Sequence, residues 1–281
     1  MKHKNQIIIF LSILTFLVNT GCDKQEDYHV QNLNHNTIMI LGHTGMGEFY
    51  KSPNNTWESI EPALGIGADG VEIDIQMTKD SVLILFHDAT LDGRTKCGGY
   101  TSPYDYNWSE IKDCNYNTLI EVIPIYTLDE LFSKIIGLSR YYFSLDVKLN
   151  KSHSYDEIYR TKFLRAIKRV CDKHEITANV FLEGDLDLQL KAREIGLKTK
   201  GILIGGSVDL AVEHDIFGIG CTVDSEKEEI DYAHQQGKYV MMWGAKTDAA
   251  NKVAIKLNPD FLQTDKPIPI LMLFERFNFD Y

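Results

Sequence analysis

The chain has 281 residues, and its 44% apolar and 25% charged residues are ordinary globular proportions. They exclude a disordered or collagen-like protein and allow one large domain or two small ones. The net charge is −11, and loss of residues 1–21, which hold Lys2 and Lys4 and no acidic residue, would change it to −13. A nucleic-acid partner is therefore not expected, because phosphate binding needs a basic surface.

Residues 1–21 have the pattern of a secretory signal peptide. Two lysines precede an apolar run, Ile7–Val18, and small or polar residues then lead to Cys22. The run is shorter than the roughly 20 residues of a membrane-spanning helix, so a permanent transmembrane anchor is the weaker interpretation. The residues before Cys22 resemble a bacterial lipoprotein box, in which Cys22 becomes the lipidated N-terminus, although Asn19 stands where Leu is usual.

These features predict a protein exported to the bacterial cell envelope, either periplasmic or at the cell surface. Its membrane contact would be the lipid on Cys22, and the polar residues 22–36 would form a flexible tether to the folded domain. In such an oxidising compartment Cys97 and Cys114 either pair or remain free, and a disulfide closing their loop would add about 3 kcal/mol. Cys171 and Cys221 are expected to be buried free thiols.

Residues 37–281 alternate between short apolar runs typical of buried strands and patterns typical of amphipathic helices. We predict eight strands, at Thr37–Leu41, Val71–Ile75, Tyr141–Val147, Asn179–Leu182, Gly201–Ile204, Phe217–Val223, Tyr239–Trp243 and Phe261–Thr264. Helices are predicted at Trp57–Ala68, Tyr155–His174, Leu186–Ile195, Glu226–Gln236 and Ala249–Leu257. This alternation predicts one α/β domain, a (β/α)8 TIM-type barrel, over residues 37–281.

One apolar run, Ser81–His87, interrupts the alternation. It follows Val71–Gln76 after only four residues, too few for a parallel crossover, so it must fold back as an antiparallel β-hairpin. The long loop that follows, up to Pro124, would then cover the carboxyl end of the barrel. The expected fold is therefore the barrel with a β-hairpin and a long loop inserted after strand 2.

The hairpin register predicts which side chains share a face. With Lys79-Asp80 as a two-residue loop, Asp74 lies opposite Leu85 and Glu72 lies opposite His87. Directly opposed residues project to the same side of a sheet, so His87 would stand beside both carboxylates. A shift of one residue would undo this arrangement.

Three carboxylates are expected near the strand ends. Glu72 and Asp74 lie two residues apart in an apolar strand and point the same way, and Asp146 and Lys148 repeat that spacing. Burial of like charges is costly unless a cation compensates it. Glu72, Asp74 and Asp146 therefore form a candidate site for one hard divalent cation, Mg²⁺ or Ca²⁺. The alternative for each acid alone is a surface residue paired with Lys148.

Two histidines are candidate catalytic groups. His43 follows the first strand and is flanked by Gly42 and Gly45, which let the backbone turn sharply at the barrel mouth. A lone histidine there would be structural more often than catalytic, but the hairpin brings His87 to the same place. Two imidazoles beside a cation can do acid and base chemistry on a phosphodiester. Asp88 is given little weight as a partner of His87, because adjacent strand residues face opposite sides.

These residues lie in motifs that resemble the glycerophosphodiester phosphodiesterase family. The similar segments are Gly42–Gly45, Pro53–Thr56, Gly67–Asp80, Leu85–Asp92, Ile123–Leu128, Asp146–Lys148, Trp243 and Gln263–Pro267. The resemblance covers nearly all of residues 37–281 and implies the same barrel. It also implies roles by position: His43 and His87 as the catalytic pair, Glu72, Asp74 and Asp146 as metal ligands, and Lys148 and Trp243 as substrate contacts.

The chain departs from the family pattern at four places. Thr44 stands where the family has an Arg expected to hold phosphate, Asn54 replaces a Glu, and Asp146 replaces the usual third Glu, as in the related sphingomyelinase D enzymes. After Trp243, Gly-Ala-Lys246 replaces Thr-Val-Asn. We hypothesise that Lys246 contacts the substrate and supplies the positive charge that Thr44 lacks.

The expected function is metal-dependent cleavage of glycerophosphodiesters to glycerol 3-phosphate and an alcohol. One alternative is a phospholipase D-like or sphingomyelinase D-like enzyme that acts on intact lipids, which an apolar rim formed by the aromatic loop Tyr100–Tyr126 would favour. Packing of those aromatic side chains beneath the loop is the more ordinary interpretation. The other alternative is a surface protein that keeps the barrel and only binds its ligand.

Overall fold

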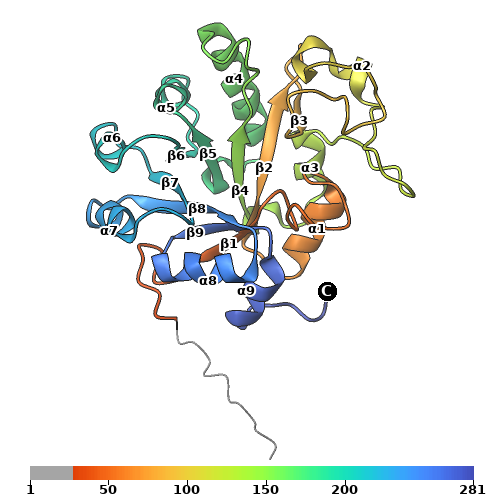
Figure 1. Cartoon of the computed structure of the whole chain (residues 1–281). Helices are drawn as coiled ribbons and strands as arrows, with labels where there is room; N and C mark the ends of the chain where they lie inside the picture. The colour runs from red at the N-terminus through yellow and green to blue at the C-terminus, as the bar shows by residue number, and fades with distance from the viewer. Residues whose placement is uncertain (1–27) are drawn as a thin grey trace, which may run out of the picture.

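The computed structural model describes residues 28–281 and forms a closed barrel surrounded by helices (Figure 1). The barrel strands are β1 (Met39–Gly42), β2 (Gly70–Met77), β4 (Tyr142–Val147), β5 (Val180–Gly184), β6 (Lys200–Leu203), β7 (Gly218–Thr222), β8 (Tyr239–Ala245) and β9 (Phe261–Thr264). All eight run parallel, and pairing of β1 with both β2 and β9 closes the ring. The predicted (β/α)8 TIM barrel is confirmed.

Five helices lie where the sequence pattern placed them. They are α1 (Trp57–Gly65), α4 (Glu157–Lys173), α5 (Leu186–Glu194), α7 (Lys227–Gln235) and α8 (Asp248–Leu257). Sequence analysis missed the short helices α2 (Trp108–Ile111), α3 (Leu128–Lys134), α6 (Val208–Glu213) and α9 (Pro267–Leu273), and the 3-10 turns Pro103–Asp105, Leu138–Arg140 and Thr177–Asn179. Such short segments contain too few turns to show a helical period. The start of α3 is instead marked by a capping box, in which Thr127 and Glu130 cap each other's backbone N–H groups.

Alternation along the strands separates a core outside the barrel from one inside it. Outward side chains such as Ile73, Ile75 and Leu145 belong to the large core beneath the helices. At the amino end of the strands the interior is filled by apolar side chains, chiefly Leu41, Phe181, Ile202, Met241 and Phe261. Polar inward residues lie above this layer, so the polar part of the interior opens at the carboxyl end.

The hairpin strand β3 (Leu83–Leu85) pairs antiparallel with the end of β2, but in a different register from the predicted one. Gln76 pairs with Ile84, and the backbone N–H of Thr78 donates to the carbonyl oxygen of Val82 at 2.9 Å. The loop therefore has three residues, and its last residue, Ser81, takes a left-handed conformation with φ of 65°. A three-residue loop that ends in this conformation is a common hairpin connection. The predicted two-residue loop was wrong by one residue.

The register shift changes which residue faces Asp74. The Phe86 N–H donates to the Asp74 carbonyl oxygen at 3.1 Å, so Phe86 occupies the place predicted for Leu85. His87 is not paired with Glu72, because β3 ends at Leu85. His87 lies beyond the end of β3, so the alternation of a strand does not fix the direction of its side chain. The side chain points toward the barrel mouth although the register differs from the predicted one.

The segment after β3 packs around a small core of its own and projects beside β2 (Figure 1). This core contains Ile84, Phe86, Leu91, Ile111, Cys114, Tyr116, Ile123 and Ile125, with Tyr100, Tyr106 and Trp108 packed against it. Cys97 and Cys114 form a disulfide, with their Cα atoms 5.4 Å apart. Cys171 and Cys221 are buried and free. The aromatic side chains of this loop are therefore packing residues and do not form a rim.

Residues 28–36 lie against the barrel, which corrects the predicted tether. The Asn32 Nδ2 atom donates to the carbonyl oxygen of Pro259 at 2.8 Å, and the Asn34 N–H donates to Asp260 Oδ1 at 3.0 Å. Pro259 and Asp260 precede β9, so this segment covers the amino end of the barrel. The boundary predicted at residue 36 was too late, because asparagine side chains can bond the backbone instead of remaining solvated.

The predicted signal peptide and Cys22 lie outside the described residues. Within residues 28–281, no helix combines the length and apolar character needed to cross a membrane.

Candidate active site

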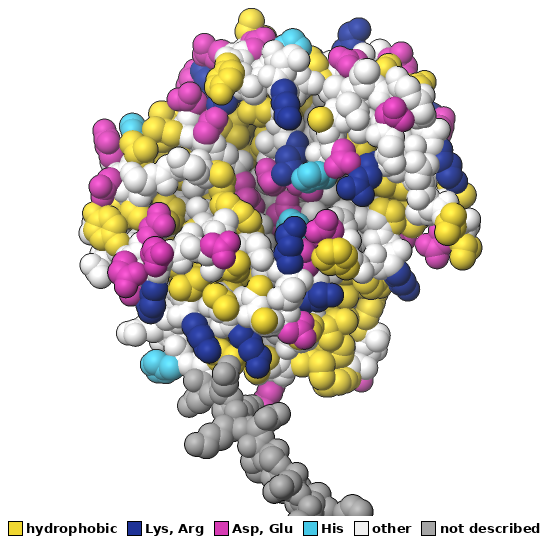
Figure 2. Space-filling view, viewed as in Figure 1, with side chains coloured by type: hydrophobic (Ala, Val, Ile, Leu, Met, Phe, Trp, Pro, Cys, Tyr) yellow, Lys and Arg dark blue, Asp and Glu magenta, His cyan; other side chains and the backbone are white. Residues whose placement is uncertain are grey.

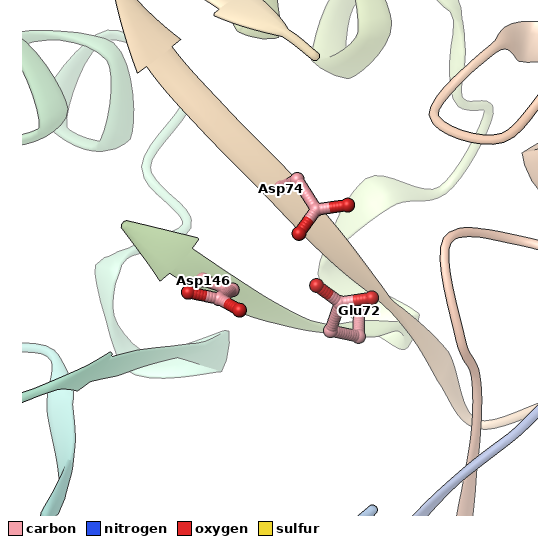
Figure 3. Close-up of side chains that lie close together, drawn as sticks. All are labelled: Glu72, Asp74 and Asp146. Atoms are coloured by element: carbon pink, nitrogen blue, oxygen red, sulfur yellow. The ribbon is translucent and has the colours of Figure 1, made fainter. Parts of the chain in front are cut away.

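Three carboxylates converge inside the barrel, two from the middle of β2 and one from near the carboxyl end of β4 (Figure 3). Glu72 and Asp74 project inward from β2, and Asp146 projects from β4, where its Cα is the register partner of the Asp74 Cα. One carboxylate oxygen from each residue lies within 4.8 Å of those from the other two. Alternation along β2 and the parallel register of β4 together bring these side chains to one place.

The carboxylates repel one another, and water screens this repulsion little at Glu72 and Asp74, which are only 2% exposed. Burial, followed by the charges of Asp74 and Asp146, raises the pKa of Glu72 well above its ordinary value. Lys148 compensates part of this charge, since its Nζ lies 3.0 Å from Asp74 Oδ1 and 2.6 Å from Asp146 Oδ2. Burial lowers the pKa of Lys148, but the two carboxylates outweigh it and raise that pKa above its ordinary value. One ammonium for three carboxylates leaves a site suited to a further cation.

The loop after β1 holds two of the carboxylates in place. Asn55 Nδ2 donates to Asp74 Oδ2 at 2.7 Å, and the Asp74 N–H donates to Asn55 Oδ1 at 2.9 Å. The Thr44 N–H donates to Glu72 Oε2 at 3.0 Å, while its hydroxyl donates to the carbonyl oxygen of His43 at 2.7 Å. Thr44 therefore supports the loop. Asn55 lies in the segment Pro53–Thr56, but nothing in that segment alone indicated that it bonds Asp74.

His43 is oriented by an aspartate from the other end of the chain. Its Nδ1 lies 2.6 Å from Asp265 Oδ1, and its Nε2 lies 3.8 Å from Glu72 Oε2. Burial lowers the pKa of His43, but the hydrogen bond and charge of Asp265 outweigh it, so the pKa is raised from its ordinary 6.5. Sequence analysis assigned Asp265 no role, because only the pairing of β1 with β9 makes the two residues neighbours.

His87 is bonded to the residue that follows it. Its Nδ1 lies 2.8 Å from Asp88 Oδ1, and the Arg94 Nε donates to Asp88 Oδ2 at 2.6 Å. Burial raises the pKa of Asp88, but the hydrogen bonds of His87 and Arg94 outweigh it and the pKa is lowered. Asp88 was given too little weight from the sequence, because both residues lie beyond β3, where the alternation of a strand no longer applies.

These groups line a cavity of about 720 Å³ at the barrel mouth. Figure 2 shows histidine, acidic and cationic side chains together in the central hollow of this face. His43, His87 and Asp74 line it, as do the cationic side chains of Lys51, Arg94 and Lys246.

The residues expected to contact substrate differ in position. The Lys246 Nζ lies 3.1 Å from Glu48 Oε2 at the cavity wall. Lys148 instead lies among the carboxylates. Trp243 lies on β8, and its indole lies close to Gly220 of β7. A Cβ added to Gly220 would come within 2.6 Å of the indole, so the glycine leaves room for that ring. Trp243 is not among the residues that line this cavity.

A further buried carboxylate near Asp146, that of Glu183 on β5, was missed from the sequence. Its Oε1 accepts hydrogen bonds from Ser144 Oγ at 2.6 Å and from Gln263 Nε2 at 2.5 Å. Burial, followed by the charge of Asp146, raises the pKa of Glu183 to about 7. In the sequence, Glu183 is marked only by being a single acidic residue at the end of an apolar run.

Comparisons with known proteins show the family to which the chain is similar. Residues 43–183, just over half of the chain, match the model of the glycerophosphoryl diester phosphodiesterase family. The chain is 26% identical to a glycerophosphodiester phosphodiesterase of Bacillus altitudinis over 239 residues, which are 81% of this chain and 94% of that protein.

Solved structures share the fold. A glycerophosphodiester phosphodiesterase of Parabacteroides distasonis superposes with a TM-score of 0.72 and 18% identity, over 85% of this chain and 98% of that one. An Oleispira antarctica phosphodiesterase in complex with the product sn-glycerol 3-phosphate gives a TM-score of 0.72 and 17% identity, over 84% and 96% of the two chains. With a family match that spans His43, the three carboxylates and His87, this chain belongs to the glycerophosphoryl diester phosphodiesterase family and is a hydrolase of phosphodiester bonds.

Proposed function

We propose that the chain cleaves glycerophosphodiesters to glycerol 3-phosphate and an alcohol, with one divalent cation and two catalytic histidines. The observation that carries this proposal is that His43, His87 and Asp74 line one cavity, and that Asp74 is clustered with Glu72 and Asp146. The product complex of the Oleispira antarctica relative supports glycerol 3-phosphate as the product here.

The residues that would hold the cation are Glu72, Asp74 and Asp146. All three offer only carboxylate oxygen, the donor that Mg²⁺ and Ca²⁺ prefer. The raised pKa of Glu72 fits this role, because it marks a place where negative charge exceeds the compensation that Lys148 provides. A bound divalent cation would supply positive charge that stabilises the phosphate oxygens as negative charge develops.

The two histidines would transfer the protons. One takes a proton from the attacking group, either water or a hydroxyl of the substrate glycerol, and the other protonates the leaving alkoxide. If the glycerol hydroxyl attacks, the first product is a cyclic phosphate, and a water molecule must then open it to give glycerol 3-phosphate. Asp265 would orient His43 through its bond to Nδ1, which leaves Nε2 to accept or donate the transferred proton. Asp88 would orient His87 through Nδ1 in the same way. The two proton transfers are assigned to this pair of histidines, without specifying which histidine performs which transfer.

Positive charge for the substrate phosphate would come from the cavity wall. Lys246 takes over the role that the family assigns to an Arg at the position of Thr44, whose buried side chain bonds the backbone. Lys148 would compensate part of the negative charge of Asp74 and Asp146, with which it forms ion pairs, and it would act on the substrate through that cluster. Trp243 would border substrate from β8.

Export is proposed on the sequence of residues 1–22 alone. In this proposal residues 1–21 are a signal peptide, Cys22 carries a lipid that binds the membrane, and the protein works in the bacterial cell envelope. No nucleic-acid partner is proposed, in line with the net charge of −11.

An intact lipid is the second candidate substrate. It is favoured by Leu119 and Ile120, which line the cavity with aliphatic side chains, and not by the packed aromatic residues of the same loop.

The test is release of glycerol 3-phosphate from a panel of glycerophosphodiesters, with EDTA and after Mg²⁺ or Ca²⁺ is restored. The chain from residue 23 onward is suitable, because it contains every residue of the described barrel. Metal-dependent release supports the proposal and shows the preferred head group. A folded protein that releases none, but cleaves a lysophospholipid, supports the second candidate, and one that cleaves neither contradicts both candidate substrates.

A further inference from the structure

Large apolar side chains on one side of the barrel mouth are exposed to solvent. Among the described residues, eight such side chains are at least 70% exposed, and six of them lie on segments that follow β1, β3 and β4. We call these six the apolar rim: Phe49, Leu119, Ile120, Val122, Tyr155 and Ile158. The loops after barrel strands lie at the carboxyl end, where the catalytic cavity opens. The rim therefore borders the entrance to the site.

Three rim residues lie on a protruding ribbon, residues 115–124, which we call the finger. Its base is ordered: Asn115 forms a bridge with Pro124, and the Tyr116 N–H donates to the Ile123 carbonyl oxygen at 2.8 Å. Both Tyr116 and Ile123 are buried in the small core of the insertion. The exposure of the finger tip is therefore a property of a folded ribbon.

The tip carries aliphatic side chains that touch almost nothing. Leu119 and Ile120 are 103% and 94% exposed, and Val122 is 71% exposed. Exposed runs of this kind are disfavoured in soluble proteins unless they serve a function. Leu119 and Ile120 also border the catalytic cavity, so whatever covers the tip lies at the entrance for substrate.

The shape of the rim indicates what covers it. A protein partner needs about 800 Å² of continuous surface per side, whereas the rim consists of separate projections on three segments, after β1, β3 and β4. A single acyl chain in the cavity would cover only one side of Leu119 or Ile120. A lipid surface would contact Phe49, the finger and the start of α4 at the same time, and would surround the tip on all sides.

We propose that the mouth of the barrel docks on a lipid surface through the apolar rim. Apolar insertion provides the attachment, because a chain with a net charge of −11 is repelled by anionic lipids, and a zwitterionic surface is the favoured partner. Residues 28–36 cover the opposite end of the barrel, so they take no part in this contact. Docking would place the cavity where phosphodiesters leave or enter a membrane.

The experiment measures binding without turnover, so its outcome does not depend on the proposed catalytic reaction. The protein used is the chain from residue 23 onward, which lacks Cys22 and therefore any lipid attached to it. It is sedimented with phosphatidylcholine vesicles at low and high salt. The variant Val122→Ser/Tyr155→Ser/Ile158→Ser changes rim residues that do not line the cavity. Its vesicle partition coefficient is expected to fall roughly tenfold, while the rate on soluble glycerophosphocholine and the Tm stay unchanged.

A matched control comes from the opposite end of the barrel. Ile136 is 88% exposed, as apolar as the rim residues, and lies between α3 and β4. Ile136→Ser is expected to leave vesicle binding unchanged. The proposal is overturned if the wild-type chain does not sediment with the vesicles, if the triple variant binds as well as wild type, or if high salt abolishes binding. A wild-type dimer that the triple variant converts to monomer would also overturn it, in favour of a second copy of the chain.

Discussion

The Nδ1 atom of His43 lies 2.6 Å from Oδ1 of Asp265, although 222 positions separate them in the chain. His43 follows β1 and Asp265 follows β9, and the two strands are paired where the barrel closes. The Asp265 side chain is only 1% exposed, so its charge acts on the imidazole with little screening by water. Closure of the barrel thus completes a histidine–aspartate pair at the site.

Asp265→Asn should lower kcat by at least about tenfold and change KM little, because the charge that stabilises a protonated His43 is lost. Steady-state kinetics on a glycerophosphodiester measure both constants. Asp185→Asn, far from the cavity lining, serves as the control and should leave kcat unchanged. A normal kcat in Asp265→Asn would show that Asp265 only supports the loop.

His43→Ala and His87→Ala should each reduce kcat by more than about 100-fold, since a positioned acid or base contributes roughly 10²–10⁴-fold. Neither change should unfold the protein, because both rings are partly exposed at the cavity. Single-turnover rates at saturating substrate measure the effect. Retention of more than about one hundredth of the wild-type rate in both variants would contradict the assigned pair.

Glu72→Gln should stabilise the metal-free protein at neutral pH and remove the rise in Tm that Mg²⁺ or Ca²⁺ causes. The pKa of Glu72 is raised on folding, so its ionised form destabilises the folded state above that pKa. Below about pH 4 both states are protonated, and the difference from wild type should vanish. Calorimetry across pH tests this, with the exposed Glu228→Gln as the control. A Glu72→Gln protein that is less stable and still binds metal would contradict it.

Lys246→Ala should raise KM for a glycerophosphodiester roughly three- to tenfold with little change in kcat, the range for an exposed charged contact. Its Nζ lies at the cavity wall, where only Glu48 is bonded to it among its described contacts. Lys252→Ala on α8, outside the cavity lining, is the matched control. An unchanged KM in Lys246→Ala would show that another group holds the phosphate, with Arg94 the next to test.

Asp185→Asn should lower Tm by roughly 2–4 °C, which corresponds to about 1 kcal/mol for a bond screened by solvent. Asp185 accepts two hydrogen bonds from Arg160, each of 2.7 Å, and these lower its pKa. The stabilisation is therefore present above the ordinary Asp pKa of about 4 and lost as the pH falls through the lowered value. Thermal unfolding of both proteins from pH 7 to pH 2 should show the difference disappear. A difference independent of pH would contradict this origin.

Spacing along a single strand predicted most of the site. Glu72 and Asp74 were placed together by the two-residue period of β2, and their distance from Asp146 followed from parallel pairing. The partner of His43 could not be predicted in the same way, because the contact with Asp265 depends on which strands meet when the barrel closes. Asn55 was missed for a related reason, because its hydrogen bond to Asp74 joins a loop to a strand, and spacing along the sequence does not predict such a contact.

The amino-acid sequence by itself determined the number of strands, the barrel and the inward direction of the carboxylates, because these depend on hydrophobic periodicity within each segment. Tertiary structure alone decided the hairpin register, the docking of residues 28–36 and the exposure of the finger. The register depended on one left-handed residue, Ser81, which nothing in the apolar pattern indicates. Exposure depends on what surrounds a side chain in space, so Leu119 and Ile120 had the same apolar character in the sequence as residues of the core.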